Sequence, residues 1–412
     1  MSHRLTEKEL RELVMAFGRL GELIVANPEP DREELRRVRA RSRRERRHAP
    51  QLFDDLLRVD PKVREEEARS DTRFHSLALV DLLLKRAQAE VLNDPKITRQ
   101  LAELALVIAD AMYPSPRVPH ATMRDYFALA HAQIGNVCRL HCQWEEAHAR
   151  FDKAQGLLLK GAGDLAIHGQ IHRMYGALLK DQRQFPAALA FLQLAQDDYR
   201  QLGQDHDVGL VLLTTAVLFR EMDDSDRALQ AHMEACHLLD ESRAPMLAAA
   251  AWNNLAILLC DLGQYAEAEV VLENLPSTFD DLPQHSTVQL DLMWARGMIA
   301  RGLGDLTHAI QCFSSVRDGY LTQGNHRSVA LVSLDLLRAY YHAGRLAEVE
   351  NLARSVYSLL RSQPLAREAI EALRVLAGAR VQRQLIEESL ERLGAFLSRN
   401  SIPGQRSPTA EP

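Results

Sequence analysis

The sequence predicts an all-α protein built from a helical repeat of about forty residues. One stretch, "LGQYAEAEVVL" at 262–272, returns as "LGDLTHAIQCF" at 303–313, forty-one residues later. A small residue, Ala268, follows another, Ala256, by twelve positions, and this pair recurs with second members at 147, 188, 228, 268, 309 and 349. Segments rich in Gly, Pro and Asp keep the same spacing. Because two unrelated markers share one period, we interpret the chain as a repeat protein.

Each unit is predicted to hold two helices. Apolar residues recur at intervals of three and four, which is the helical period. The first break falls near the glycine of "DLGQY", "GLGDL" or "HAGRL", and the second falls between units. A small residue on each helix would let the two helices cross closely. Besides Ala256/Ala268, the small pairs are Gly135/Ala147, Gly176/Ala188, Ala216/Ala228 and Gly297/Ala309, with a degenerate sixth at Leu337/Val349.

The residue types identify the kind of repeat. The period alone would favour HEAT or armadillo repeats, which run at about 40–47 residues against 34 for the tetratricopeptide repeat (TPR). One unit nevertheless resembles the TPR pattern residue for residue: Trp252, Leu255, Ala256, Leu259, Gly263, Tyr265, Ala268 and Leu272. The resemblance covers about residues 120–360. It implies a right-handed superhelical solenoid of TPR-type helix pairs, with elongated units and an N-terminal helical region.

The expected domain organisation follows from this register. Residues 1–70 form an N-terminal helical region with an Arg-rich segment, and 71–119 form a degenerate TPR-like unit and a Pro-rich linker. An elongated array of about six units occupies 120–362. We expect capping helices at 363–398, and a disordered tail at 399–412 because of its polar, Pro-containing composition.

The N-terminal region contains a strongly basic run. Between Arg32 and Arg47 there are nine Arg and three Glu, a net charge of +6. Such a run can bind nucleic acid or another anionic partner. It is also typical of a solvated basic helix that docks on an acidic array, which we favour. No helix-turn-helix or zinc-finger pattern accompanies the run, so a nucleic-acid function would rest on charge alone.

Composition favours a cytoplasmic protein. The N-terminus has charges scattered among its apolar residues and so lacks the core of a secretory signal. No apolar stretch approaches the length of a membrane helix, so we expect no membrane partner. Five cysteines, an odd and widely spread set, fit a reducing compartment. The net charge of −6 on 412 residues selects no partner by itself.

Catalysis is not predicted. Thiols and imidazoles close enough in sequence to suggest a zinc site are Cys138, His141, Cys142, His148, His168 and His172. The repeat register argues for structural roles instead, because Cys138 and His172 occupy framework positions, while His141 and Cys142 fall at the turn between helices. No phosphate-binding loop or nucleophile motif is present. We therefore expect no enzyme activity, no metal and no cofactor.

The resemblance implies that the first helix of each unit lines a concave groove at its second, fifth, ninth and twelfth positions, with the small residue as eighth. The twelfth position holds Arg139, Lys180, Arg220, Cys260 and Arg301, four of them basic. This column suits carboxylates or an acidic segment. The candidate ligand-binding residues are Asn136, Arg139, Arg173, Lys180, Arg220, Asn253, Trp294 and Arg301. Acidic residues directly after three of these positions, Asp181, Glu221 and Asp261, could instead neutralise the column.

Three functions stay open at this point. The leading hypothesis is a non-enzymatic scaffold or adaptor that holds a protein or peptide, preferably acidic, in the groove. A second is a regulator that resembles the Rap-type peptide receptors of bacteria, in which a short N-terminal region precedes elongated TPRs. A third is a nucleic-acid-associated protein that acts through the run from Arg32 to Arg47. The sequence names neither the partner nor the oligomeric state.

Overall fold

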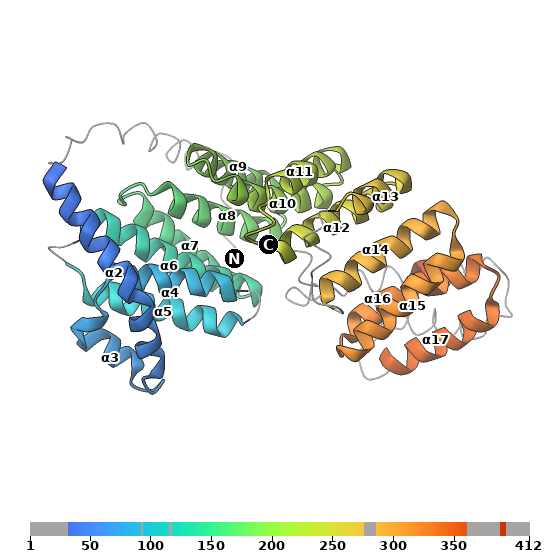
Figure 1. Ribbon diagram of the computed structural model, residues 1–412, viewed down its shortest axis with the longest axis horizontal. Coiled ribbons are helices and arrows are strands. Elements are labelled where there is room, and N and C mark those ends of the chain that lie inside the picture. The colour runs from blue at the N-terminus through green and yellow to red at the C-terminus, as the bar shows by residue number, and fades with distance from the viewer. Residues whose placement is uncertain (1–31, 92–93, 115–117, 276–285, 361–387, 393–412) are drawn as a thin grey trace. The chain divides into compact units, whose positions relative to one another are not determined.

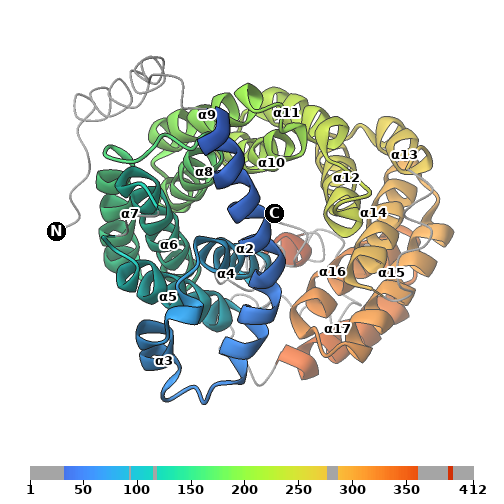
Figure 2. The same ribbon diagram turned by 60° about the vertical axis from the view of Figure 1, so that its left-hand side comes forward.

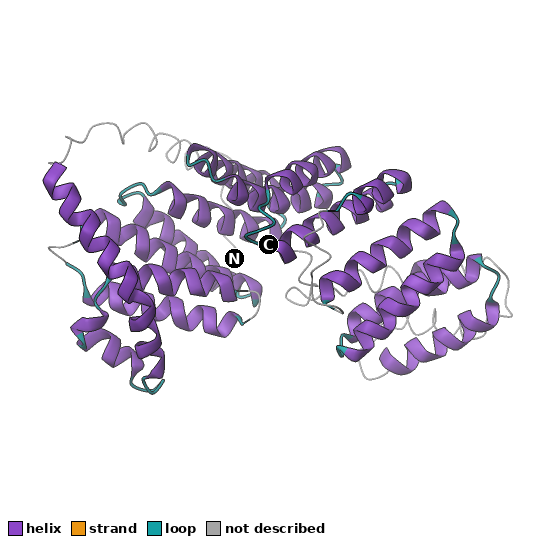
Figure 3. Ribbon diagram, in the orientation of Figure 1, coloured by secondary structure: helices purple, strands orange, loops and turns teal. Residues whose placement is uncertain are grey.

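The computed structural model describes residues 32–91, 94–114, 118–275, 286–360 and 388–392. In these ranges every regular element is helical, as Figure 3 shows. The prediction of an all-α fold is therefore confirmed. Within the same ranges, no helix is both long and apolar enough to cross a membrane. The chain divides into two compact units, Met1–Val211 and Leu212–Pro412, which are described separately.

The described part of the first unit starts with a long helix and continues as packed helix pairs (Figures 1 and 2). Its elements are α2 (Arg32–Arg58), α3 (Arg64–Ser70), the 3-10 helix η2 (Thr72–Phe74), α4 (Leu77–Glu90), α5 (Pro95–Ala111), α6 (His120–Leu140), α7 (Trp144–Leu158), α8 (Leu165–Asp181) and α9 (Phe185–Gln201). The pairs are α4 with α5, α6 with α7, and α8 with α9. The first helices α4, α6 and α8 also pack side by side.

The second unit repeats this arrangement. Helix α10 (Asp205–Glu221) spans the division, and the following elements are α11 (Ser225–Leu238), α12 (Pro245–Asp261), α13 (Tyr265–Glu273), α14 (Thr287–Leu303), α15 (Leu306–Thr322), α16 (His326–His342) and α17 (Leu346–Leu360). Here the first helices α12, α14 and α16 lie next to one another. Six helix pairs, α6/α7 to α16/α17, therefore follow the predicted repeat.

The turn between the two helices of each pair contains one residue with a left-handed backbone. That residue is glycine in three units: Gly263 (φ 75°), Gly304 (φ 91°) and Gly344 (φ 72°). In the other three units it is Cys142, Arg183 and Asp223, with φ of 57°, 58° and 59°. A side chain in this region costs roughly 1–2 kcal/mol. The turn geometry thus repeats at the period read from the sequence, even where glycine does not.

The small residues allow close helix crossings, as expected. A Cβ atom built on Gly176 would lie 2.9 Å from Leu192 Cγ, and one built on Gly297 would lie 2.6 Å from the Phe313 ring. The second members of five pairs are fully buried: Ala147, Ala188, Ala228, Ala268 and Ala309. Any larger side chain at these positions would force the helices apart.

Three predictions fall wholly or largely outside the described residues. The N-terminal helix before residue 32 and the tail at 399–412 are not described. Of the expected capping helices at 363–398, only 388–392 is described, and it is helical. Its Leu390 is buried and belongs to the apolar core cluster formed by α14 to α17.

Candidate groove face

The candidate residues all lie on first helices. Asn136 and Arg139 are on α6, Arg173 and Lys180 on α8, Arg220 on α10, Asn253 on α12, and Trp294 and Arg301 on α14. We call these eight residues the groove face. Their positions recur with the repeat, so their environments can be compared from one unit to the next.

Arg139 links two consecutive first helices. Its side chain donates to Asn136 Oδ1 at 2.8 Å and to Asp181 Oδ2 at 2.5 Å. Lys180 Nζ lies 3.3 Å from the other oxygen of Asp181. Both cations are buried, with Lys180 only 1% exposed. One carboxylate on α8 therefore holds two buried cations, and the contact joins residues forty-two positions apart.

A second inter-helix cluster forms around Asp335 on α16, which is largely buried. Trp294 Nε1 donates to Asp335 Oδ2 at 2.9 Å. Arg301 and Arg338 each place a guanidinium nitrogen 3.5 Å from Oδ1. The cluster brings two groove-face residues together, since Trp294 and Arg301 share the same carboxylate on the next first helix.

Arg220 differs from the other three basic residues of the column. Its side chain is exposed and makes no ion pair with the described residues. Its charge still acts on two neighbours. Desolvation raises the pKa of Asp261, and the Arg220 guanidinium partly offsets that rise. Burial lowers the pKa of His232 to about 4, and Arg220 adds to this effect.

The two remaining groove-face residues have different environments. Asn253 on α12 is fully buried, and neither polar atom of its amide has a hydrogen-bond partner among the described residues. Arg173 on α8 is half-buried beside Tyr199. Burial raises the pKa of the Tyr199 phenol, and the charge of Arg173 partly offsets the rise. Asn253 is therefore the groove-face residue with the largest unsatisfied hydrogen-bonding capacity.

The thiols and imidazoles considered as metal ligands lie in the helix packing or in the turn between helices. Cys138 is fully buried, and burial raises the pKa of its thiol. His172 is also buried, with Nδ1 at 2.8 Å from Asp198 Oδ2. His141 and Cys142 lie just after α6, in the turn. Among the residues that the structure describes, no three His, Cys, Asp or Glu side chains converge as a metal site would require.

The basic run forms the N-terminal half of α2. Arg43, Arg44, Arg46 and Arg47 have exposed side chains, and none makes an ion pair with a described residue. Further along the same helix Ala49 and Leu56 are buried, where α2 packs on α4. Four unpaired cations within two helical turns thus form an exposed basic surface.

Sequence reasoning missed two residues of this region. Asp335 was not considered because its unit lacks the small-residue pair that set the register. His232 occupies the position four residues after an anchor alanine, where other units place Phe151, Leu192 and Phe313. Comparing the repeats at that position would have shown a polar residue in an apolar framework.

Comparison with known proteins supports the fold. No family model matches the sequence, and no curated protein matches it. The apo form of RapI is similar in structure, with a TM-score of 0.61 and 12% identity over 77% of this chain and 87% of that one. So is a signal transduction ATPase (STAND protein) with a tetratricopeptide repeat sensor from Pyrococcus horikoshii, with a TM-score of 0.60 and 11% identity. The match covers 86% of this chain and 53%, about half, of the latter. The fold is of the TPR type.

Proposed function

We propose that this protein is a non-enzymatic scaffold or adaptor that binds a protein or peptide on the groove face. The observation that carries the proposal is the register between neighbouring first helices. Arg139 contacts Asp181 on the next first helix, and Trp294 contacts Asp335 in the same way. Groove-face residues of successive units therefore lie side by side within each compact unit. Repeat proteins of this kind use such continuous faces for binding.

The charges of this face indicate where an acidic ligand would bind. Arg139, Lys180 and Arg301 already have carboxylate partners. Arg220 is exposed and has no ion pair with a described residue, so its charge is available to a partner. The Asn253 amide is fully buried, so it is not accessible to a ligand in this structure. We therefore propose an acidic peptide or a C-terminal carboxylate as the ligand, with Arg220 as the main ionic contact.

A peptide selection tests this proposal. A random peptide display library would be enriched on the full chain, and the affinity of selected peptides measured for the Arg220→Glu variant. Arg86→Glu is the matched control, since Arg86 is exposed on α4 and has no ion pair with a described residue. We expect acidic peptides whose affinity falls at least tenfold in Arg220→Glu only. Equal affinity for both variants would show that the face does not bind them.

The exposed arginines of α2 support a second candidate function, association with nucleic acid. A protein that binds through phosphate contacts loses affinity steeply as salt rises. Changing all four residues, Arg43, Arg44, Arg46 and Arg47, to glutamine should abolish duplex DNA or RNA binding measured by fluorescence anisotropy. A third candidate function is regulation in response to a peptide. Deleting residues 1–70 distinguishes the two kinds of protein: a plain scaffold would still bind its peptide, whereas a peptide-responsive regulator would lose its output.

We also propose a cytoplasmic location. All five cysteines are free thiols, and four of them are buried. Such a set is typical of proteins from a reducing compartment.

A further inference from the structure

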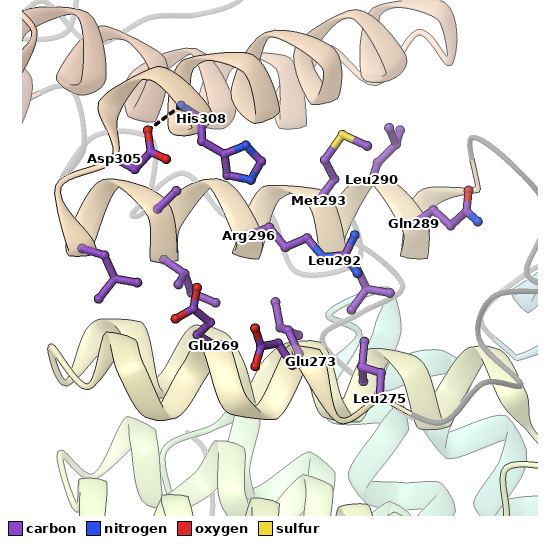
Figure 4. Close-up of a pocket in the computed structure, with 14 residues that line it drawn as sticks. Glu269, Glu273, Leu275, Gln289, Leu290, Leu292, Met293, Arg296, Asp305 and His308 are labelled. Carbon is purple, nitrogen blue, oxygen red and sulfur yellow. Dashed lines mark hydrogen bonds between the residues drawn. The ribbon is translucent and has the colours of Figure 1, made fainter.

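A cleft lies along α14 between the consecutive second helices α13 and α15 (Figure 4). Its volume is about 830 Å³. Its lining residues come from α13, from nearly the whole length of α14 between Gln289 and Leu303, and from the start of α15. None of the eight groove-face residues lines it. The cleft is therefore a second surface feature of the array, separate from the proposed peptide site.

The cleft exists because α13 is short. It has 9 residues, whereas the other second helices α7, α9, α11, α15 and α17 have 15, 17, 14, 17 and 15. Seven positions after each anchor residue, those helices bury a compact apolar side chain: Ala154, Ala195, Ala235, Val316 and Val356. The equivalent residue here, Leu275, lies beyond the end of α13 and is only half-buried. Among the described residues, none of α13 covers the adjoining face of α14.

The dimensions of the cleft restrict what can enter. The fourteen residue steps from Gln289 to Leu303 correspond to ~21 Å along the helix axis. A volume of 830 Å³ over that length gives a mean cross-section of about 40 Å². A complete helix, about 10–12 Å wide, is too thick for this space. One row of side chains from a helix lying above the cleft fits, as a ridge fits a groove when two helices pack.

The lining combines an apolar floor with unpaired charges. Leu272, Leu292 and Ile299 form buried parts of the floor, and Leu303 is 50% exposed at one end. Figure 4 shows Glu269 and Glu273 extending from α13 toward α14. Both carboxylates are exposed, and neither makes an ion pair with a described residue. Two like charges four residues apart on one helix repel each other, and a cation between them would relieve that repulsion.

We propose that this cleft docks an amphipathic helix of a partner protein. The helix inserts one row of apolar side chains and places Lys or Arg along the edge that faces Glu269 and Glu273. A helix suits the site better than an extended chain, because it satisfies its own backbone groups, while the lining is mainly apolar and ionic. Arg296 is exposed on α14 and makes no ion pair with a described residue. It forms an ion pair with an acidic residue of the same partner.

Two synthetic helical peptides test the proposal on the full chain. Both carry the same leucine row, and one has lysine along both edges while the other has glutamate. We expect fluorescence anisotropy to show at least a tenfold preference for the lysine peptide. The double change Glu269→Lys and Glu273→Lys should reverse that preference, whereas Glu267→Lys, an exposed position on α13 that does not line the cleft, should preserve it.

The remaining variants locate the binding. Leu303→Asp should weaken both peptides at least fivefold, because it removes exposed apolar surface from the cleft. Arg220→Glu should change neither affinity, so failure of the groove-face proposal and failure of this one are distinguishable. Thermal melts would verify that each variant folds. The proposal is overturned if neither peptide binds, if both bind equally, if the double variant keeps the lysine preference, or if only Arg220→Glu alters binding.

Discussion

Arg139 and Arg220 occupy the same position of their repeats but have different surroundings. Each is followed, on the next first helix, by a carboxylate in the same register: Asp181 for Arg139 and Asp261 for Arg220. Arg139 is buried and lies 2.5 Å from Asp181. Arg220 is exposed and makes no ion pair with a described residue, although its charge partly offsets the rise that desolvation causes in the pKa of Asp261.

The difference shows what a repeat determines and what it leaves to individual residues. Asp181 follows Lys180, so two cations approach one carboxylate, and Asn136 holds the Arg139 guanidinium in place. Asp261 follows Cys260, which supplies no charge. The repeat places a basic and an acidic residue in register, but the adjoining residues decide whether they form a buried pair or leave the cation accessible.

The largest expected effect is a difference in unfolding free energy between variants that lack Asp181 and variants that lack Asp261. Asp181→Ala removes the carboxylate that neutralises the buried cations Arg139 and Lys180. This loss should lower the unfolding free energy by about 3–5 kcal/mol. Asp261→Ala should cost less than about 1 kcal/mol, since Asp261 makes no ion pair with a described residue and desolvation already disfavours its charged form. Urea unfolding of both variants beside the parent measures the difference. Similar losses in the two variants would contradict the proposed contrast between the pairs.

A second change tests whether the two regions share the same framework despite that contrast. Ala188 and Ala228 are both fully buried at the helix crossing. Leucine at either position should cost about 1–3 kcal/mol through overpacking. We expect similar drops in melting temperature, by calorimetry, for Ala188→Leu and Ala228→Leu. If either variant melted like the parent, the register of its helix crossing would be wrong.

The sequence predicted the framework better than the groove face. The helix pairs and their period could be read because small residues and turn residues must recur wherever the same crossing recurs, as at Gly176 and Gly263. Asp181 could also be named in advance, as an acidic residue directly after the column, and it pairs with Arg139. Asp335, the partner of Trp294, could not be, since it lies on the next first helix, in a unit without the small-residue pair. The cleft beside α13 was also not predicted. The unit around Ala268 matches the repeat pattern, which predicts a second helix of ordinary length and gives no sign that α13 ends early.

His232 places a buried polar group close to Arg220, at a position that is apolar in other units. Its Nδ1 has no hydrogen-bond partner in the described part of the chain, and other units place an apolar residue at this position. His232→Leu should therefore stabilise the protein by about 1–2 kcal/mol at pH 7, because it removes an unsatisfied group. Calorimetry at pH 7 measures this gain. A loss of stability would show that the imidazole contributes a contact that leucine cannot replace.

The same variant has a pH signature. The pKa of His232 is lowered from 6.5 to about 4 by burial, so the unfolded state binds more protons between these values. Stability contributed by the neutral imidazole is thus present above pH 6.5 and lost as pH falls toward 4. His232→Leu should flatten this acid-side loss. His131, whose pKa is also lowered to about 4 by burial, still contributes to the acid-side loss of stability in the His232→Leu variant. It therefore serves as an internal control.

The smallest effect on stability is expected at Arg220 itself. Arg220→Glu should change the unfolding free energy by no more than about 0.5 kcal/mol, because an exposed, unpaired side chain is replaced by another. Arg301→Glu is the matched comparison, and it should be clearly less stable, since the new carboxylate would lie beside Asp335. The reversal at Arg220 should also raise the pKa of His232, because a cation that lowers that pKa becomes an anion. Nuclear magnetic resonance of the imidazole measures the shift. An unchanged His232 titration would mean that the side chains of Arg220 and His232 are too far apart to interact, which would contradict the environment assigned to Arg220.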